Sequence, residues 1–241
     1  QHAGNDHKFE IITFKNAFHG RTMATISASN QEKMHKGFMP LLAGFKYVDF
    51  DDLEGAKAAI GPNTAAIMVE PIQGEGGVRP ASQAFMQGLR DLCDEHGLLL
   101  ILDEVQCGVA RTGTHYAYEQ YGVTPDITTF AKAVTSGSQP LGGVFVGPTV
   151  LDPLEADPGY VLKTGYTYSG HATACAAALT NLAIIEREGL LERALHIGQR
   201  IGAGLRSIAD DGLIAHARGD GAVWAAAMRD DQDAQRVRDR M

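Results

Sequence analysis

The sequence is poor in the residues that mark several common classes of protein. It contains 3 cysteines in 241 residues, an odd number that implies no disulfide framework and suits a reduced cytosolic protein. Its net charge is −8 without a long basic run, so neither nucleic acid nor an anionic membrane surface is an expected partner. No apolar run approaches the roughly 20 residues of a membrane span, and no signal-peptide pattern opens the chain. These absences favour a soluble, cytoplasmic protein.

Two common kinds of ligand site are missing as well. A nicotinamide-binding Rossmann domain needs Gly-x-Gly-x-x-Gly between its first strand and helix, and the run at 74–77 (GEGG) has the wrong spacing. The 9 histidines are scattered and no cysteine pair has ligand spacing, so no metal site is expected. Any catalytic chemistry must therefore come from other residue types.

Apolar segments alternate between strand and helix patterns along the chain. Strands are predicted at 10–14, 46–50, 65–69, 98–102, 127–131 and 141–147. Helices are predicted at 51–60, 82–96, 115–121, 172–188 and 191–208. This alternation predicts an α/β fold with a mostly parallel sheet covered by helices. The strand at 141–147 follows its predecessor without a helix, so we expect it to run antiparallel.

The C-terminal part has a different pattern. Segment 151–159 carries Pro and Asp and is expected to be a loop, and a strand-like stretch at 214–228 suggests the start of a smaller α+β domain. We therefore expect a large domain over 1–190 and the beginning of a small domain over 191–241. The chain begins at Gln1 without Met and stops at Met241 in a polar, helix-like stretch, which we interpret as a fragment.

The stretch LLLILDEVQ at 98–106 is the first that points to chemistry. Its apolar start predicts a strand buried on both faces, yet Asp103 and Glu104 follow at once, and buried charges need partners. Lys132 ends the next apolar strand, 29 residues after Asp103. Ligands bind beyond the carboxyl ends of strands in α/β sheets, so this acid and this lysine are expected to face one cofactor. That geometry is typical of a pyridoxal phosphate site.

A glycine-rich loop at 70–77 follows another predicted strand. Its glycines let the backbone pass close to a ligand, while Glu70 and Glu75 supply carboxylates. A flexible turn with solvated acids is the alternative interpretation. Phe18 follows the first strand, and an ordinary place in the core is the commoner fate of a lone aromatic residue.

The motifs together resemble one enzyme family. In order and spacing, class III pyridoxal-phosphate aminotransferases share VEPIQGEGG at 69–77, LDEVQCG at 102–108 with RTG at 111–113, FAKAVTSG at 130–137 and GYTYSGH at 165–171. The resemblance covers nearly the whole chain. FHGRT at 18–22 and the helix at 85–96 look most like acetylornithine and ornithine aminotransferases, whereas TSGSQPLGG at 135–143 and TYSGHATACAAAL at 167–179 look like ω-amino acid–pyruvate and taurine–pyruvate aminotransferases.

The resemblance implies a fold type I large domain, pyridoxal 5'-phosphate as cofactor, and roles for single residues. Lys132 matches the Schiff-base lysine, and Asp103 matches the partner of the pyridine nitrogen. The other implied cofactor contacts are Phe18 on one ring face with His19 beside it, Val105 on the other face, Gln106 at the ring hydroxyl, and Thr167 at the phosphate of the neighbouring subunit. The active sites of the family are therefore shared across a homodimer.

Substrate-binding positions are matched too. Arg21 is the arginine of FHGRT, which holds a substrate carboxylate in the ornithine-type relatives, and Glu75 is the glutamate that gates a C-terminal arginine. The implied reaction moves the amino group of an N-acetylornithine-like or ornithine-like donor to 2-oxoglutarate or pyruvate. Donors such as β-alanine, 4-aminobutyrate or taurine, and an aminomutase or racemase of the same fold, stay open. So does an inactive fragment, because the family's N-terminal phosphate-binding turn and C-terminal arginine have no match in this chain.

Overall fold

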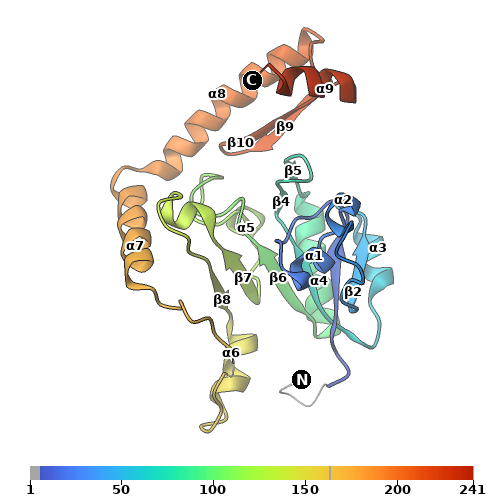
Figure 1. Cartoon of the computed structure of the whole chain (residues 1–241), viewed down its shortest axis with the longest axis vertical. Coiled ribbons are helices and arrows are strands. Elements are labelled where there is room, and N and C mark those ends of the chain that lie inside the picture. The colour runs from blue at the N-terminus through green and yellow to red at the C-terminus, as the bar shows by residue number, and fades with distance from the viewer. Residues whose placement is uncertain (1–5, 163, 241) are drawn as a thin grey trace.

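A six-stranded sheet forms the centre of the molecule (Figure 1), which is a computed structural model describing residues 6–162 and 164–240. Its order is β2-β1-β3-β6-β7-β8. The strands are β1 (Glu10–Phe14), β2 (Phe45–Val48), β3 (Thr64–Val69), β6 (Leu99–Asp103), β7 (Ile127–Phe130) and β8 (Gly143–Val146). Every pair is parallel except β7 with β8. The mostly parallel α/β sheet and its antiparallel last strand are thus confirmed. Gln1 and Met241, on which the fragment interpretation depends, lie outside the described residues.

Helix α4 (Gln83–His96) builds the main core against one face of the sheet. The Ser82 hydroxyl caps its start by accepting the Phe85 N–H at 3.2 Å, and Gly97 ends it in the left-handed conformation that glycine adopts at low cost. Phe85 packs edge-on against Phe14, with ring centroids 5.2 Å apart. Helix α3 (Leu53–Ala59) lies beside α4, so this layer fixes the position of the strands that carry the site.

Burial of β6 differs between the two faces of the sheet. Leu100 and Leu102 are fully buried under α4, whereas Leu99 and Ile101 are half-buried. The prediction that this strand is buried on both faces is therefore wrong for the face that carries Leu99 and Ile101. The apolar run predicted the strand, but it did not predict how far each face is covered.

Several short elements connect the strands. They are α1 (Met23–Ala28), α2 (Glu32–His35), the β4 (Ile72–Gln73) and β5 (Arg79–Pro80) hairpin, α5 (Tyr118–Tyr121), the 3₁₀ helix η1 (Lys132–Thr135) and α6 (Pro148–Glu155). Helix α6 corrects the prediction of a loop over 151–159 for residues 151–155, whereas residues 156–159 lie outside any helix or strand, as predicted. Pro148 occupies the first turn of α6, where its fixed φ suits a helix start.

The C-terminal part runs along one side of the sheet and then over its edge (Figure 1). It comprises α7 (Ala172–Arg187), α8 (Leu190–Asp210), β9 (His216–Asp220), β10 (Val223–Ala227) and α9 (Asp231–Arg238). The single strand-like stretch is an antiparallel hairpin, β9 with β10. Gly221 at its turn approaches the loop after β6 so closely that a Cβ there would lie 2.3 Å from the Thr112 Cα. Within the described residues, no helix is long and apolar enough to cross a membrane.

Candidate active site

Loops from four strands meet at the carboxyl-end edge of the sheet. From β1 the chain goes outward to β2 and returns to β3 on the other side of β1, so the loops after β1 and β3 diverge at a topological switch point. Phe18 and His19 lie in the first of these loops and Glu70 starts the second. Asp103 ends β6 and Lys132 follows β7. The structure therefore brings the predicted acid and lysine to one edge, where such sheets bind ligands.

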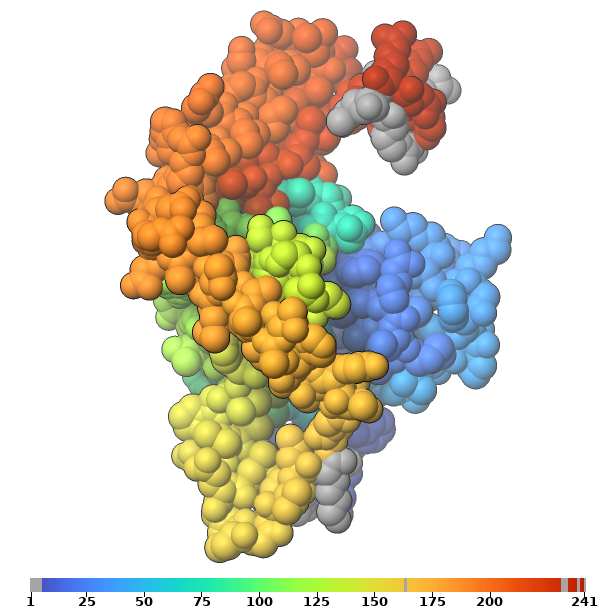
Figure 2. Space-filling model, turned by 60° about the vertical axis from the view of Figure 1, so that its left-hand side comes forward, coloured from blue at the N-terminus to red at the C-terminus, as the bar shows by residue number. Residues whose placement is uncertain are grey.

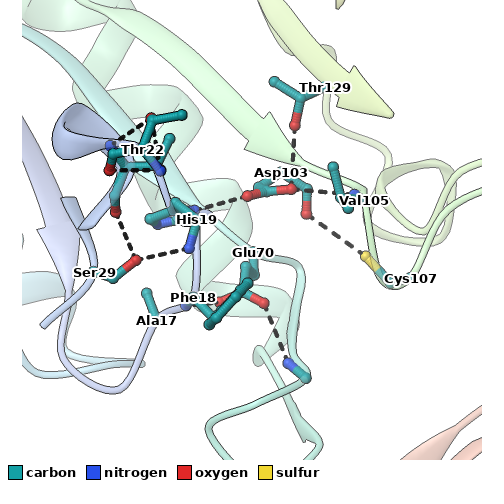
Figure 3. Close-up of polar contacts among 12 residues, drawn as sticks. Ala17, Phe18, His19, Thr22, Ser29, Glu70, Asp103, Val105, Cys107 and Thr129 are labelled. Atoms are coloured by element: carbon teal, nitrogen blue, oxygen red, sulfur yellow. Dashed lines mark hydrogen bonds and ion pairs between the residues drawn. The ribbon is translucent and has the colours of Figure 1, made fainter. Parts of the chain in front are cut away.

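The Asp103 carboxylate is buried and held by three donors (Figure 3). One oxygen accepts the Val105 N–H and the Thr129 hydroxyl, each at 3.1 Å. The other oxygen lies 2.8 Å from His19 Nδ1. Donors from three separate segments thus fix the direction of this acid. The sequence did not predict Thr129 as a partner of Asp103. The one signal for it is that Thr129 lies on β7, the strand that pairs with β6.

His19 is held from both sides. Its side chain is fully buried, and its backbone N–H donates to the Ser29 hydroxyl at 2.8 Å. Ser29 follows α1, where its own hydroxyl donates to the Thr25 carbonyl. Among the described residues the second ring nitrogen, Nε2, has no hydrogen-bond partner. His19 thus orients Asp103, and its Nε2 is a buried polar atom without a hydrogen-bond partner among the described residues.

Glu70 ties the two loops of the switch point together. It is 2% exposed, and its oxygens accept the N–H groups of Phe18 at 2.8 Å and of Gly74 at 3.2 Å. Burial raises the pKa of Glu70 to about 7, although the charge of His19 and these N–H groups lower it. Near neutral pH this carboxyl is therefore close to its midpoint of ionisation.

Glu104 has a structural role. It is 1% exposed and accepts the backbone N–H groups of Ala117 at 3.1 Å and Tyr118 at 2.8 Å. The Cys107 thiol donates to it at 3.0 Å, and burial raises the pKa of this glutamate. The partners that a buried charge at this position needs are therefore two backbone N–H groups and the Cys107 thiol, and they anchor the loop that carries Val105.

Lys132 begins η1 with a left-handed backbone. Its φ is +43°, a region that costs a residue with a side chain on the order of 1–2 kcal/mol. Such strain persists only where surrounding contacts hold it, and it is common at functional sites.

The electrostatic surroundings of the Lys132 amine are mixed. Burial lowers its pKa and the charge of Arg111 lowers it further, whereas Asp103, Glu70 and Glu75 raise it. The net effect is a pKa below the ordinary lysine value. A larger fraction of this amine is therefore neutral at neutral pH than of a solvated lysine.

Gln106 and Glu75 border a cavity of about 230 Å³. Gly74 lies so close to Gln106 that a Cβ there would be 2.4 Å from its amide oxygen, which explains the glycine. The amide nitrogen of Gln106 is buried without a hydrogen-bond partner in the described chain. Arg111 lines the same cavity, so a carboxylate, a guanidinium and an unmatched amide donor converge there.

Phe18 and Arg21 lie together in the loop after β1. The Arg21 guanidinium carbon is 5.4 Å from the centroid of the Phe18 ring, which is within cation–π distance. Arg21 is exposed. The predicted substrate-binding arginine is thus beside the predicted ring-stacking phenylalanine.

Thr167 lies apart from these residues. It is exposed, in the turn before α7, and Figure 2 shows the segment leading into α7 on the outside of the molecule. Of the sequence-predicted residues, it is the one that the structure does not bring to the carboxyl-end edge. The shared-site interpretation expects this, because it places Thr167 at the neighbouring subunit.

A mostly parallel sheet with a buried acid at the end of one strand and a lysine after the next is typical of pyridoxal-phosphate proteins of fold type I. Comparison with protein families narrows this class. The model of the family Aminotransferase class-III matches residues 1–240, so the chain belongs to the class III aminotransferases. Members of this family depend on pyridoxal phosphate.

Curated relatives support the same family. The chain is 45% identical to acetylornithine aminotransferase from Agrobacterium fabrum over 228 residues, which are 94% of this chain and 56% of the relative. It is 48% identical over 190 residues to the same enzyme from Rhodobacter capsulatus, covering 78% of this chain and 47% of the relative. The chain therefore spans about half the length of the curated relatives that it matches.

Solved structures agree with this fold. An (S)-enantioselective ω-transaminase from Thermomicrobium roseum matches with a TM-score of 0.89 and 34% identity, over 96% of this chain and 56% of that one. Ornithine aminotransferase from Toxoplasma gondii matches with a TM-score of 0.84 and 34% identity, over 93% and 52%. An ornithine aminotransferase and an ω-transaminase are thus both among the structural neighbours.

The Glu70 carboxyl generates a prediction about pH and stability. The pKa of Glu70 rises from 4.5 to about 7 on folding, so the folded protein favours the protonated carboxyl. The contribution of Glu70 to the free energy of unfolding is therefore fully present below pH 4.5 and is lost as the pH rises through 7. The difference in unfolding free energy between the wild type and Glu70→Gln should therefore move by about 3 kcal/mol in favour of the variant over this range. Urea unfolding of both proteins at several pH values measures it. A difference that is constant with pH contradicts the raised pKa.

Proposed function

We propose that the protein is a pyridoxal-phosphate-dependent aminotransferase that moves the amino group of an ω-amino donor, N-acetylornithine or ornithine in type, to a 2-oxo acid. The acceptor is 2-oxoglutarate or pyruvate. The observation that carries the proposal is the buried, three-fold hydrogen-bonded Asp103 carboxylate at one strand end, with the Lys132 amine at the end of the next strand. Family membership supports it.

The residues at the sheet edge fit the cofactor. Gln106 has a buried amide nitrogen without a described partner, which suits the ring hydroxyl that the family places there. Phe18 lies in the loop after β1 and Val105 in the loop after β6, and Figure 3 shows them on either side of Asp103. They suit the two faces of a flat ring. When bound, pyridoxal phosphate supplies an aldehyde for amines and a pyridine ring that accepts electron density.

Each polar residue then has a defined task. Asp103 keeps a proton on the pyridine nitrogen, because an ionised carboxylate favours the protonated form of a neighbouring base. His19 and Thr129 hold Asp103 in one orientation for that contact. Lys132 moves a proton at the substrate carbon that bears the amine, and its lowered pKa leaves it closer to the neutral, basic form.

Arg21 supports a donor that carries a carboxylate. A guanidinium presents two parallel N–H groups to a carboxylate, and Arg21 lies at the Phe18 ring. The acetylornithine aminotransferases among the relatives favour N-acetylornithine. The ω-transaminase neighbours favour the second candidate, a donor such as 4-aminobutyrate, β-alanine or taurine with pyruvate as acceptor.

A homodimer with shared active sites completes the proposal. Exposed apolar residues occur on β8, on α7 and in the segment before α7, and exposed apolar surface is a feature of interfaces. They include Val144, Phe145 and Val146 on β8, Leu179 on α7, and Tyr166 and Tyr168 beside Thr167. Thr167 would reach the cofactor phosphate of the partner subunit. In this proposal residues 1–190 belong to the large domain and residues 191–241 to a small C-terminal domain. The protein acts in the cytoplasm, without a nucleic acid or membrane partner.

Lys132 should be the residue that bonds to the cofactor. Borohydride reduction of the full-length protein with pyridoxal phosphate, followed by peptide mapping, is expected to label Lys132, and Lys132→Ala should abolish labelling and turnover. Lys15→Ala is the matched control, because Lys15 also follows a strand of this sheet but pairs with Asp49 at 2.9 Å. Label on another lysine in the wild type removes Lys132 from this role.

Arg21 should determine the donor. Arg21→Lys is expected to raise the KM for N-acetylornithine about tenfold or more, because an ammonium does not reproduce two parallel hydrogen bonds. Steady-state assays with N-acetylornithine, 4-aminobutyrate and taurine, each with 2-oxoglutarate and pyruvate, measure this. Arg187→Lys, on the exposed end of α7, is the control. Unchanged kinetics with Arg21→Lys, or no turnover of either ornithine compound, would favour the ω-amino acid donors.

Mixed dimers test the shared site. One subunit carrying Lys132→Ala and one carrying Thr167→Ala together form one site with both residues intact, provided that Thr167 acts across the interface. Random mixing should then restore about a quarter of the wild-type sites, because half of the dimers are mixed and each has one intact site. Activity at limiting cofactor measures this recovery. An absence of recovery shows that Thr167 serves its own subunit or none.

A further inference from the structure

The turn that carries Lys132 has left-handed residues at both of its ends. Lys132 begins η1 with a φ of +43°, and Ser136 follows its end with a φ of +51°. Backbone hydrogen bonds between residues three apart, such as that from the Val134 N–H to the Ala131 carbonyl at 3.1 Å, close a single 3₁₀ turn. Short 3₁₀ turns have poor hydrogen-bond geometry. An external contact is therefore needed to keep this backbone in its strained form.

Asn181 on α7 makes that contact. Its side-chain nitrogen donates to the carbonyl oxygens of Ala133 at 2.9 Å and of Val134 at 3.1 Å. These are the two residues directly after Lys132, and they lie 48 and 47 residues from Asn181 in the sequence. One amide group thus uses both of its hydrogens on the turn.

Apolar packing gives α7 a fixed position over the turn. Val134 is 4% exposed and shares a cluster with Ala178 and Ile185, which lie one turn before and one turn after Asn181 on α7. The amide therefore comes from a long, packed helix rather than from a mobile loop. A rigid support of this kind is what a strained backbone requires.

We infer that Asn181 is a positioning residue for Lys132: its two hydrogen bonds hold the left-handed turn that directs the lysine amine toward Asp103. The inference rests on the proposed function for the role of Lys132, but the contact itself belongs to this chain. The charged groups that act on the amine are Asp103, Glu70, Glu75 and Arg111. Lys132 is exposed, so loosening the turn changes the distances of its amine from these four groups rather than its access to water.

Two variants and one control separate this role from general stability. Asn181→Asp keeps the shape but replaces the donor with an oxygen beside two carbonyl oxygens, and Asn181→Ala removes the amide altogether. Thr180→Ala is the control, because Thr180 is the adjacent, exposed residue of α7 and its hydroxyl donates to the Ala176 carbonyl of the same helix. Circular dichroism and urea unfolding establish that each variant is folded.

The first measurement is hydrogen exchange of the peptide spanning residues 131–138, without cofactor. Both Asn181 variants should exchange about tenfold faster than the wild type in this peptide, because each hydrogen bond lost lowers the cost of local opening. Thr180→Ala should exchange at the wild-type rate. Wild-type protection in both Asn181 variants overturns the inference.

The second measurement is the pH dependence with which the Lys132 amine reacts with acetic anhydride, read by peptide mass spectrometry. Lys46, which pairs with Glu10 at 2.7 Å, is the internal reference. The Lys132 profile should shift by about half a pH unit or more in the Asn181 variants, because the amine moves relative to Asp103, Glu70, Glu75 and Arg111, while Lys46 stays unchanged. A profile that stays at the wild-type position shows a structural role alone and contradicts the inference. Neither measurement uses the cofactor, so labelling of another lysine by borohydride would refute the proposed function separately.

Discussion

The rest of the site depends on one buried carboxylate. Asp103 ends β6, and Leu100 and Leu102 of this strand pack under α4. This packing fixes Asp103 at the edge of the sheet where ligands bind. A charge at that depth is stable only with donors around it, and the loops after β1 and β6 and the strand β7 each supply one. Phe18, Val105 and Lys132 lie on those same segments or directly after them. The donors to this carboxylate therefore also fix the segments that carry Phe18, Val105 and Lys132, the residues proposed to contact the cofactor.

A second buried carboxylate connects the site to its glycine-rich loop. Glu70 binds the backbone of Phe18 on one side and of Gly74 on the other, so the segment expected to stack on the cofactor ring and the loop that carries Glu75 share one anchor. Its pKa of about 7 makes that anchor sensitive to pH in the neutral range. The hairpin β9–β10 contacts the same loop through Arg218, which donates to the Gly77 carbonyl. The C-terminal part thus touches the loop that borders the cavity lined by Glu75, Gln106 and Arg111.

The sequence predicted what depends on local pattern. Strands followed by Asp103 and Lys132, and a helix capped by Ser82 and ended by Gly97, are visible as periodicity and caps, and the structure confirms these elements. Contacts between segments far apart in the chain were not predictable, because no spacing rule links Asn181 to Ala133 or Ser29 to His19. Helix α1 (Met23–Ala28) was missed because six residues are too few to show a helical period. The roles of Arg21, Glu75 and Thr167 came from family resemblance, and they remain proposals.

The central claim is that the Asp103 carboxylate keeps the pyridine nitrogen of the bound cofactor protonated. Nitrogen NMR of the full-length protein loaded with ¹⁵N-labelled pyridoxal phosphate reports that proton directly, independently of substrate and turnover. The account predicts a protonated nitrogen in the wild type and an unprotonated one in Asp103→Asn, which keeps the shape of the side chain but removes its charge. A nitrogen that stays protonated in the variant, or that carries no proton in the wild type, would contradict it.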